Sequence, residues 1–208
     1  RDYYASRGLG DVYKRQDGSV LIFAQTTTYV DALYNILGEI YSGDVTRYHS
    51  RIKPECRKKQ LLFDFLQGKR KIMIATSAFS MGIDVADIEL VVHFNAPISM
   101  TDYIQQIGRA GRDGRKAHCV IFYDQNGDDE AISNSFIKKA KKQSAKAAKT
   151  IKSNLNQVHN FIHSESCMVC DILEHQGQHE TKTCKRCTVC AQKRRNSKCC
   201  LLYTSDAA

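Results

Sequence analysis

The chain has 208 residues, enough for one ordinary domain and a small appendage, and 42% of them are hydrophobic, which excludes a disordered tail. The formal net charge of +9 directs attention to polyanionic partners. No apolar run approaches the roughly 18 residues that a membrane-spanning helix needs, and residues 1–16 lack the apolar core of a signal peptide. We therefore expect neither a membrane protein nor a secreted one.

The two ends of the chain differ from the rest. Residues 1–16 and 200–208 show no hydrophobic periodicity and resemble translated adapter DNA from sequencing libraries. We interpret both as non-native tails, which makes the remainder a fragment of a longer gene.

Short apolar runs alternate with amphipathic segments through the first part of the chain. Helices are predicted around 30–40 and 54–66, and a short one starts at Ser99 or Thr101. The predicted strands are residues 19–24, 45–49, 71–76, 89–94 and 117–123. This alternation predicts an α/β domain over 17–126, in which helices cover both faces of a parallel sheet. Ligands of such sheets bind beyond the carboxyl ends of the strands.

From about residue 128 the pattern becomes purely helical. Seven lysines fall between 138 and 152, beside a sparse apolar face that predicts one or two helices over 128–163. We assign residues 127–199 to a second, small helical subdomain that contains most of the cysteines.

The strongest chemical motif is YIQQIGRAGRDG at 103–114, where Arg109 and Arg112 stand among three glycines. Small residues let backbone approach a ligand closely, and guanidinium groups match phosphate oxygens. The alternative is a surface turn whose arginines face solvent.

A second motif, ATSAFSMGIDVAD at 75–87, follows a predicted strand. Hydroxyl groups there suit a phosphodiester backbone, and the carboxylate of Asp84 suits a ribose hydroxyl. The alternative is an ordinary loop with a capping aspartate.

In this order and at this spacing the two motifs resemble helicase motifs V and VI of superfamily 2. VVHFNAP at 91–97 and GRDG at 111–114 narrow the resemblance to the RecQ family of ATP-dependent DNA helicases. IFAQTTT at 22–28 resembles motif IV, and 48–57 resembles the DNA-contacting segment that follows it. The resemblance runs from about residue 19 to 190 and implies a second RecA-like lobe followed by a zinc-binding subdomain.

The resemblance implies a catalytic set in motif VI. Arg112 would be the arginine finger on the γ-phosphate of ATP, Arg109 would assist it, and Gln105 would couple nucleotide to DNA. Magnesium ligands and the phosphate cradle would belong to a missing first lobe, because the chain has no G-x-x-x-x-G-K-[ST] sequence and no D-E-x-H box.

Further contacts are implied by the same resemblance. Asp84 and Gly82 would lie near the nucleotide. The residues implied to contact nucleic acid in the lobe are Thr26, His49, Thr76 and Ser77. The chain departs from the family at Ser50–Arg51, usually Ala-Gly, and at Gln106, usually Glu. We interpret both departures as tolerated variation.

Five cysteines lie between 167 and 190. Cys167, Cys184, Cys187 and Cys190 resemble the RecQ zinc spacing of one cysteine, sixteen residues and C-x-x-C-x-x-C. Four thiolates suit one structural Zn²⁺. Cys170 permits a competing set with Cys167, Cys187 and Cys190, and redox thiols without metal are a further alternative.

Basic residues surround the cysteines, with no acid between 181 and 199. Lys185 and Arg186 are candidate contacts to nucleic acid phosphates. The alternative is a solvated charged face, which applies equally to the lysines of 138–152.

The resemblance implies an enzyme that couples ATP hydrolysis to 3′–5′ unwinding of DNA in recombination and repair. Its partners would be single-stranded DNA, duplex junctions and the first lobe of its own native chain. It would be monomeric, in a bacterial cytoplasm at the nucleoid. We expect no ATP turnover by this fragment alone. Alternatives are an RNA-dependent superfamily 2 helicase and a non-catalytic, zinc-stabilised nucleic-acid-binding module.

Overall fold

A computed structural model describes residues 18–80, 88–112, 114–124 and 127–197, and these form two compact units. The first unit contains the described residues up to Phe94 together with Gly108–Phe122. The second contains Asn95–Ile107 and the described residues from Tyr123 onward. The tails assigned to residues 1–16 and 200–208 lie outside the described residues.

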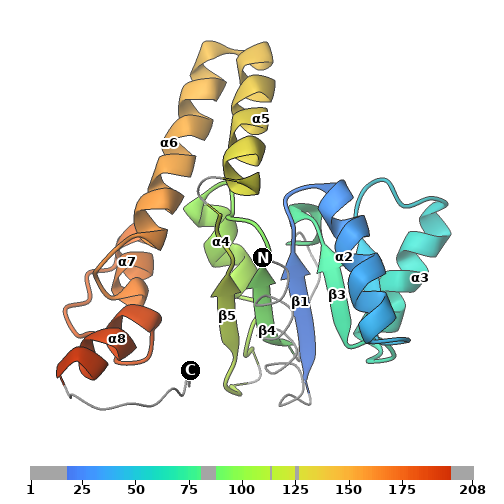
Figure 1. Ribbon diagram of the computed structural model, residues 1–208, viewed down its shortest axis with the longest axis horizontal. Helices are drawn as coiled ribbons and strands as arrows, with labels where there is room; N and C mark the ends of the chain where they lie inside the picture. Colours follow the sequence, from blue (N-terminus) through green and yellow to red (C-terminus); the bar gives the residue numbers. More distant parts are fainter. Residues whose placement is uncertain (1–17, 81–87, 113, 125–126, 198–208) are drawn as a thin grey trace. The chain divides into compact units, whose positions relative to one another are not determined.

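The first unit is built on a parallel sheet (Figure 1). Its strands are β1 (Ser19–Phe23), β2 (Val45–Tyr48), β3 (Ile72–Ala75), β4 (Ile88–His93) and β5 (His118–Ile121). Neighbouring strands pair in the order β2-β3-β1-β4-β5, so the strand that begins the unit lies at the centre of the sheet. The predicted parallel sheet is confirmed.

Two helices and a 3₁₀ turn connect these strands: α2 (Thr27–Ile40), α3 (Glu55–Leu66) and η1 (Ser77–Ser80). α2 begins where it does because the Thr26 hydroxyl accepts a hydrogen bond from the Tyr29 N–H at 3.2 Å. Pro54 occupies the N-cap of α3, one position before the first helical turn in which we expected it.

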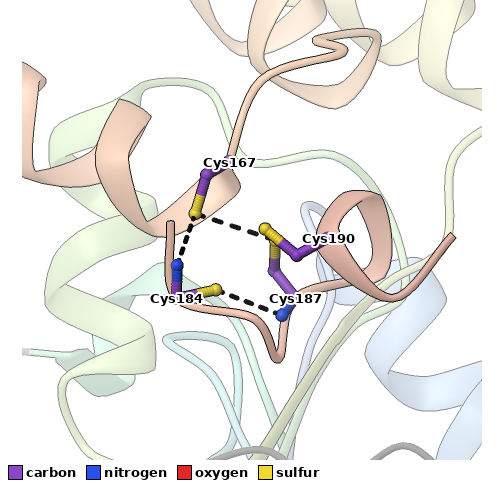
Figure 2. Close-up of side chains that lie close together, drawn as sticks. All are labelled: Cys167, Cys184, Cys187 and Cys190. Carbon is purple, nitrogen blue, oxygen red and sulfur yellow. Dashed lines mark hydrogen bonds between the residues drawn. The ribbon is translucent and has the colours of Figure 1, made fainter. Parts of the chain in front are cut away.

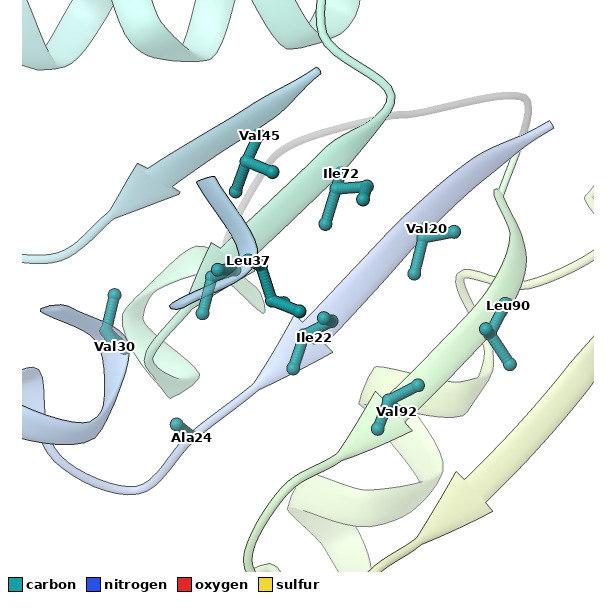
Figure 3. Close-up of a cluster of buried hydrophobic side chains, with 10 residues drawn as sticks. Val20, Ile22, Ala24, Val30, Leu37, Val45, Ile72, Leu90 and Val92 are labelled. Atoms are coloured by element: carbon teal, nitrogen blue, oxygen red, sulfur yellow. The ribbon is translucent and has the colours of Figure 1, made fainter. Parts of the chain in front are cut away.

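The core of this unit lies on both faces of the sheet. Along β1, Val20 and Ile22 belong to one buried cluster, while Leu21 and Phe23 belong to the other. The first cluster includes two side chains from α2 (Figure 3), and the second includes Phe65 from α3. The helices therefore bury opposite faces, as the near-continuous apolar strands predict.

The second unit is helical in its described part. Its helices are α4 (Met100–Ile107), α5 (Asp128–Gln143), α6 (Ala145–Ile162), α7 (Met168–His175) and α8 (Thr188–Ser197). The Ser99 hydroxyl accepts the Asp102 N–H at 3.0 Å, which makes Ser99 rather than Thr101 the cap of α4. Tyr103 of α4 packs on Phe161 of α6 with ring centroids 5.3 Å apart.

Asp129 organises the start of α5. Its carboxylate is 5% exposed and accepts backbone N–H groups from Ala96 at 2.7 Å and from Asp124 at 2.8 Å. Burial raises the pKa of Asp129, and the two backbone donors oppose that rise. Among the described helices, none combines the length and apolar character that crossing a membrane requires.

Candidate functional site

The hydroxyl and histidine residues expected to contact nucleic acid gather at one edge of the sheet. Thr26 follows β1, His49 follows β2, and Thr76 and Ser77 follow β3. These three strands are parallel neighbours, so their carboxyl ends meet at a common edge. The structure therefore brings together residues that are far apart in the sequence.

His49 is held rigidly at this edge. It is only 3% exposed, and its Nε2 lies 3.1 Å from Oδ1 of Asp31. Its Nδ1 accepts the backbone N–H of Arg51 at 3.2 Å, which assigns the ring proton to Nε2. Both ring nitrogens are therefore engaged within the protein, and His49 orders the following loop rather than presenting a bare nitrogen to a ligand.

The same aspartate also pairs with an arginine. Oδ1 of Asp31 lies 2.5 Å from Nη1 of Arg47, whose guanidinium stands 4.5 Å from the ring centroid of Tyr34. Asp31 and Arg47 were not among the candidates from the sequence. They are 16 residues apart, and no local pattern links a residue on a helix to one on a strand so far away.

Asp31, Arg47 and His49 form part of the wall of an open cavity of about 230 Å³. The wall is completed by Arg51, Ile52, Lys53, Arg57 and Leu61. Four permanently cationic side chains face one carboxylate, leaving a surplus of three positive charges. Such a cavity suits an anion, and arginine and lysine side chains commonly bind phosphate groups.

The threonine and serine residues differ in what they offer. The Thr26 hydroxyl caps α2, so its oxygen already accepts a hydrogen bond. Thr76 is half-buried, and its backbone bridges β2 to η1 by donating to the Tyr48 carbonyl and accepting the Phe79 N–H. Ser77 is exposed at the start of η1, whereas Thr26 and Thr76 are half-buried.

The arginine loop, described at residues 108–112 and 114, lies at the opposite edge of the sheet, where β4 begins. The Gly111 N–H donates to the carbonyl of Ile88, the first residue of β4, at 3.0 Å. Gly111 has φ +64°, and a Cβ there would stand 2.8 Å from the Arg115 carbonyl oxygen. Glycine is required at this position both by the left-handed backbone and by the close approach.

The two arginines of this loop have different environments. Arg109 is only 8% exposed, whereas Arg112 is exposed and its Nε donates to the Gly108 carbonyl at 3.2 Å. This hydrogen bond ties the Arg112 guanidinium to the backbone of its own loop at the protein surface.

The remaining motif residues fall into two groups. Gln105 is exposed on α4 of the second unit, while its neighbour Gln106 is 1% exposed. This burial suits a neutral amide at 106, because an ion there would carry a large desolvation cost. Gly82 and Asp84 lie outside the described residues.

Four cysteines converge in the second unit (Figure 2). The Sγ atoms of Cys167, Cys184, Cys187 and Cys190 all lie within 4.8 Å of one another. Cys167 and Cys187 are 4.0 Å apart at sulfur. A tetrahedral Zn²⁺ with Zn–S bonds of about 2.3 Å holds its sulfurs roughly 3.8 Å apart, so the four thiols fit such an ion.

Backbone donors support negative charge on these sulfurs. Cys184 N–H donates to Sγ of Cys167 at 3.3 Å, and Cys187 N–H donates to Sγ of Cys184 at 3.2 Å. Lys185 adopts φ +60° in the turn that makes this geometry possible. Burial opposes ionisation of Cys167, but the Cys184 and Cys170 N–H groups and neighbouring thiols lower its pKa to about 6.

The pKa values of the cysteines next to Cys167 are shifted in the opposite direction. Burial and adjacent thiols raise the pKa values of Cys184 and Cys190. One thiolate therefore suppresses ionisation of the next, and a cation is what allows all four to be negative together.

The competing ligand set is not the one that the structure assembles. Cys170 Sγ lies 3.5 Å from the Lys182 carbonyl oxygen, to which it donates, and it is not a member of the four-sulfur group. Lys185 and Arg186 are exposed within the C-x-x-C turn between Cys184 and Cys187.

The chain is similar to several proteins of known class. The family of helicase conserved C-terminal domains matches residues 6–114. ATP-dependent DNA helicase RecQ of Bacillus subtilis is 31% identical over 176 residues, covering 84% of this chain and 28% of the relative. A putative ATP-dependent RNA helicase of Acanthamoeba polyphaga mimivirus, R290, is 31% identical over 185 residues, covering 89% and 33%.

Among solved structures, DEAD-box helicase domain 2 of Mss116p bound to an RNA duplex gives a TM-score of 0.52 at 19% identity. That match covers 65% of this chain and 63% of the other, and at this identity it supports the fold alone. The chain spans about a third or less of the length of the two sequence relatives described above.

Proposed function

Because the chain belongs to the family of helicase conserved C-terminal domains, we propose that it is the second RecA-like lobe and zinc module of an ATP-dependent DNA helicase. Nucleotide binds between this lobe and a first lobe of the native chain, and hydrolysis drives 3′–5′ unwinding in recombination and repair. The similarity to bacterial RecQ supports this proposal, together with a location at the bacterial nucleoid.

The observation that carries the proposal is the contrast between the two arginines of the glycine loop. Arg112 is exposed, its Nε donates to the Gly108 carbonyl of the same loop, and the Gly111 N–H joins this loop to β4 at the Ile88 carbonyl. Arg109, three residues earlier in the same loop, is buried. An exposed, preorganised guanidinium stabilises the charge that develops on a γ-phosphoryl group, and such a finger is worth about 10³-fold or more in rate.

Nucleic acid is bound at the other edge of the sheet, beyond the carboxyl ends of β1, β2 and β3. The basic cavity beside His49 and the exposed Ser77 hydroxyl bind the phosphates of single-stranded DNA. Separation of the two edges lets nucleotide and DNA be held simultaneously. Gln105 links the two events, and Asp84 and Gly82 line the nucleotide site.

The cysteine cluster contributes a structural metal. We assign one Zn²⁺ to Cys167, Cys184, Cys187 and Cys190, whose sulfurs fit its geometry. The ion would supply four metal–sulfur bonds that hold a module too small to have a large core. Lys185 and Arg186 then project from a fixed turn toward DNA phosphates.

The test is a chimera in which a P-loop-bearing first lobe of a RecQ helicase precedes residue 18. Alone, the present chain should hydrolyse ATP at the background rate, whereas the chimera should turn over ATP in a DNA-stimulated manner. Arg112→Ala in the chimera should keep DNA affinity and lose about 10³-fold in turnover. Turnover that survives this change would remove Arg112 from the mechanism, and DNA-stimulated turnover by the chain alone would refute the two-lobe requirement.

Two other functions have a specific observation in their favour. The similarity to RNA helicases supports an RNA-dependent motor, which predicts that RNA stimulates the chimera more than DNA does. The thiol cluster with its basic turn supports a non-catalytic binding module. In that case Arg109→Ala and Arg112→Ala would lower only salt-sensitive affinity, with no turnover to lose.

A further inference from the structure

The hairpin formed by α5 and α6 carries an unusual concentration of positive charge. Between residues 131 and 164 the chain contains seven lysines and no aspartate or glutamate. All seven lysines are exposed. We call these residues the lysine tip: Lys138, Lys139, Lys141, Lys142, Lys146, Lys149 and Lys152.

The connection between the helices brings these charges together (Figure 1). Ser144 alone separates α5 from α6, donating its N–H to the Ala140 carbonyl at 3.0 Å and accepting the Ala147 N–H on Oγ at 3.0 Å. The lysines occupy the last six residues of α5 and the first eight of α6. These stretches are about 9 and 12 Å long, comparable to the Debye length of about 8 Å at physiological salt.

Helix stability accounts for only part of this arrangement, because only Lys141 and Lys142, in the last turn of α5, complement the helix dipole. Lys138 and Lys142 are like charges at i,i+4 on α5, and such pairs destabilise a helix. Lys146 and Lys149 lie in the first turns of α6, where the helix dipole disfavours positive charge. In the described part of the chain, no ion pair joins a lysine of the tip to a carboxylate.

The composition of the tip indicates what would bind there. The exposed large apolar side chains among the described residues are Ile36, Ile40, Phe63, Leu66 and Val169, and none belongs to the tip. Between the lysines stand Ala, Ser, Gln, Thr and Ile151, which is half-buried. A surface that offers lysine charges and lacks exposed bulky apolar groups suits a phosphate backbone better than insertion into a lipid surface.

We propose that the lysine tip binds the phosphate backbone of a nucleic acid, as a contact surface additional to the basic cavity of the first unit. The choice of nucleic acid as the ligand rests on the proposed helicase function. Lysines on both arms of the hairpin can contact phosphates without reading bases, so the contact is independent of sequence.

The experiment measures binding of the full 208-residue chain to a DNA duplex with a single-stranded tail over a series of salt concentrations. The tip variant combines K141Q, K142Q, K146Q and K149Q, since glutamine keeps helix propensity close to that of lysine. The control variant combines K59Q, K69Q, K71Q and K116Q, which removes the same charge from exposed lysines of the first unit. Circular dichroism of each variant verifies that its helices persist.

The tip variant should lower the slope of log affinity against log salt by about 2 to 4, because each lost phosphate contact contributes roughly 0.9. The control variant should change the slope by less than about 1. Equal changes in both variants would overturn the proposal, since net charge would then explain the binding, and so would a wild-type chain that does not bind. Wild-type binding to phosphatidylserine vesicles that the tip variant loses, with DNA affinity unchanged, would also overturn it in favour of a membrane surface.

Failure here is distinguishable from failure of the helicase proposal. DNA-stimulated ATP turnover by the chimera depends on Arg112 and the first lobe, whereas the salt slope of the tip variant requires neither ATP nor a second lobe. A chimera that turns over ATP with an unchanged salt slope would refute the lysine tip alone.

Discussion

Asp31 on α2 binds the buried ring of His49 beyond β2, with Oδ1 of the carboxylate 3.1 Å from Nε2. The same oxygen pairs with Arg47, so one carboxylate sets the positions of two basic side chains in the wall of the anion cavity. A negative group inside a basic cavity thus has a structural purpose, because it orients the Arg47 guanidinium and the His49 ring in the cavity wall.

We predict that Asp31→Ala destabilises the protein by about 1–3 kcal/mol, because Nε2 of His49 loses its partner while the ring stays buried. Asp31→Asn is the matched control, since its carbonyl oxygen still accepts from Nε2, and it should lose clearly less. Urea denaturation measures both. Equal stability of Asp31→Ala and the wild type would show that the contact with His49 contributes nothing.

Gly111→Ala should destabilise the first unit by about 1–2 kcal/mol from its left-handed backbone alone, with a further loss from the close approach to Arg115. Gly114→Ala is the informative comparison, because Gly114 has φ +81° but open space around it. Gly38→Ala, in the interior of α2 with nothing within 4 Å, should instead stabilise by about 0.5–1 kcal/mol. Thermal denaturation should show the lowest melting temperature for Gly111→Ala, a higher one for Gly114→Ala and the highest for Gly38→Ala. A neutral Gly111→Ala would contradict the close approach of this position to Arg115.

Cysteine substitutions should separate the metal ligands from the additional thiol. Cys184→Ser should lose bound zinc and the order of α7 and α8, because it removes a sulfur of the four-atom set. Cys170→Ser should retain about one equivalent. Elemental analysis of both purified proteins decides the matter, and loss of zinc from Cys170→Ser would reinstate the competing ligand set.

The stability of the second unit should carry a pH dependence that originates at Asp129. Burial raises the folded-state pKa of this carboxyl above its ordinary value of 3.8. Its contribution is therefore fully present below the unfolded pKa and is lost as pH rises through the folded pKa.

Asp129→Asn removes this titration, although it also loses one acceptor for the N–H groups of Ala96 and Asp124. The difference in unfolding free energy between wild type and variant should shrink as pH rises from below 3.8 through the raised pKa. Melting temperatures of both proteins across the acidic range test the sign. A difference in unfolding free energy that grows with pH would mean that the two backbone N–H donors lower the pKa of Asp129 more than burial raises it.

Local elements were predictable wherever neighbouring residues decide them. Apolar runs marked the strands, and Ser99 was one of the two predicted starts of the short helix, because a cap bonds to a backbone group only three residues away. The predicted helix over 54–66 begins one residue later, because Pro54 is its N-cap. The N-cap and the first helical turn both tolerate a residue without an N–H, so the sequence did not distinguish the two positions.

The glycine loop and the cysteine spacing predicted phosphate and zinc chemistry, because phosphate and zinc ligands use few residue types, and the four cysteines do converge in the structure. Tertiary structure alone buried Arg109 and exposed Arg112, and it excluded Cys170 from the four-sulfur set. It also joined Asp31 to His49 across 18 residues. These outcomes depend on which strands become neighbours and which groups leave water, and both follow from packing of the whole sheet rather than from any local stretch of chain.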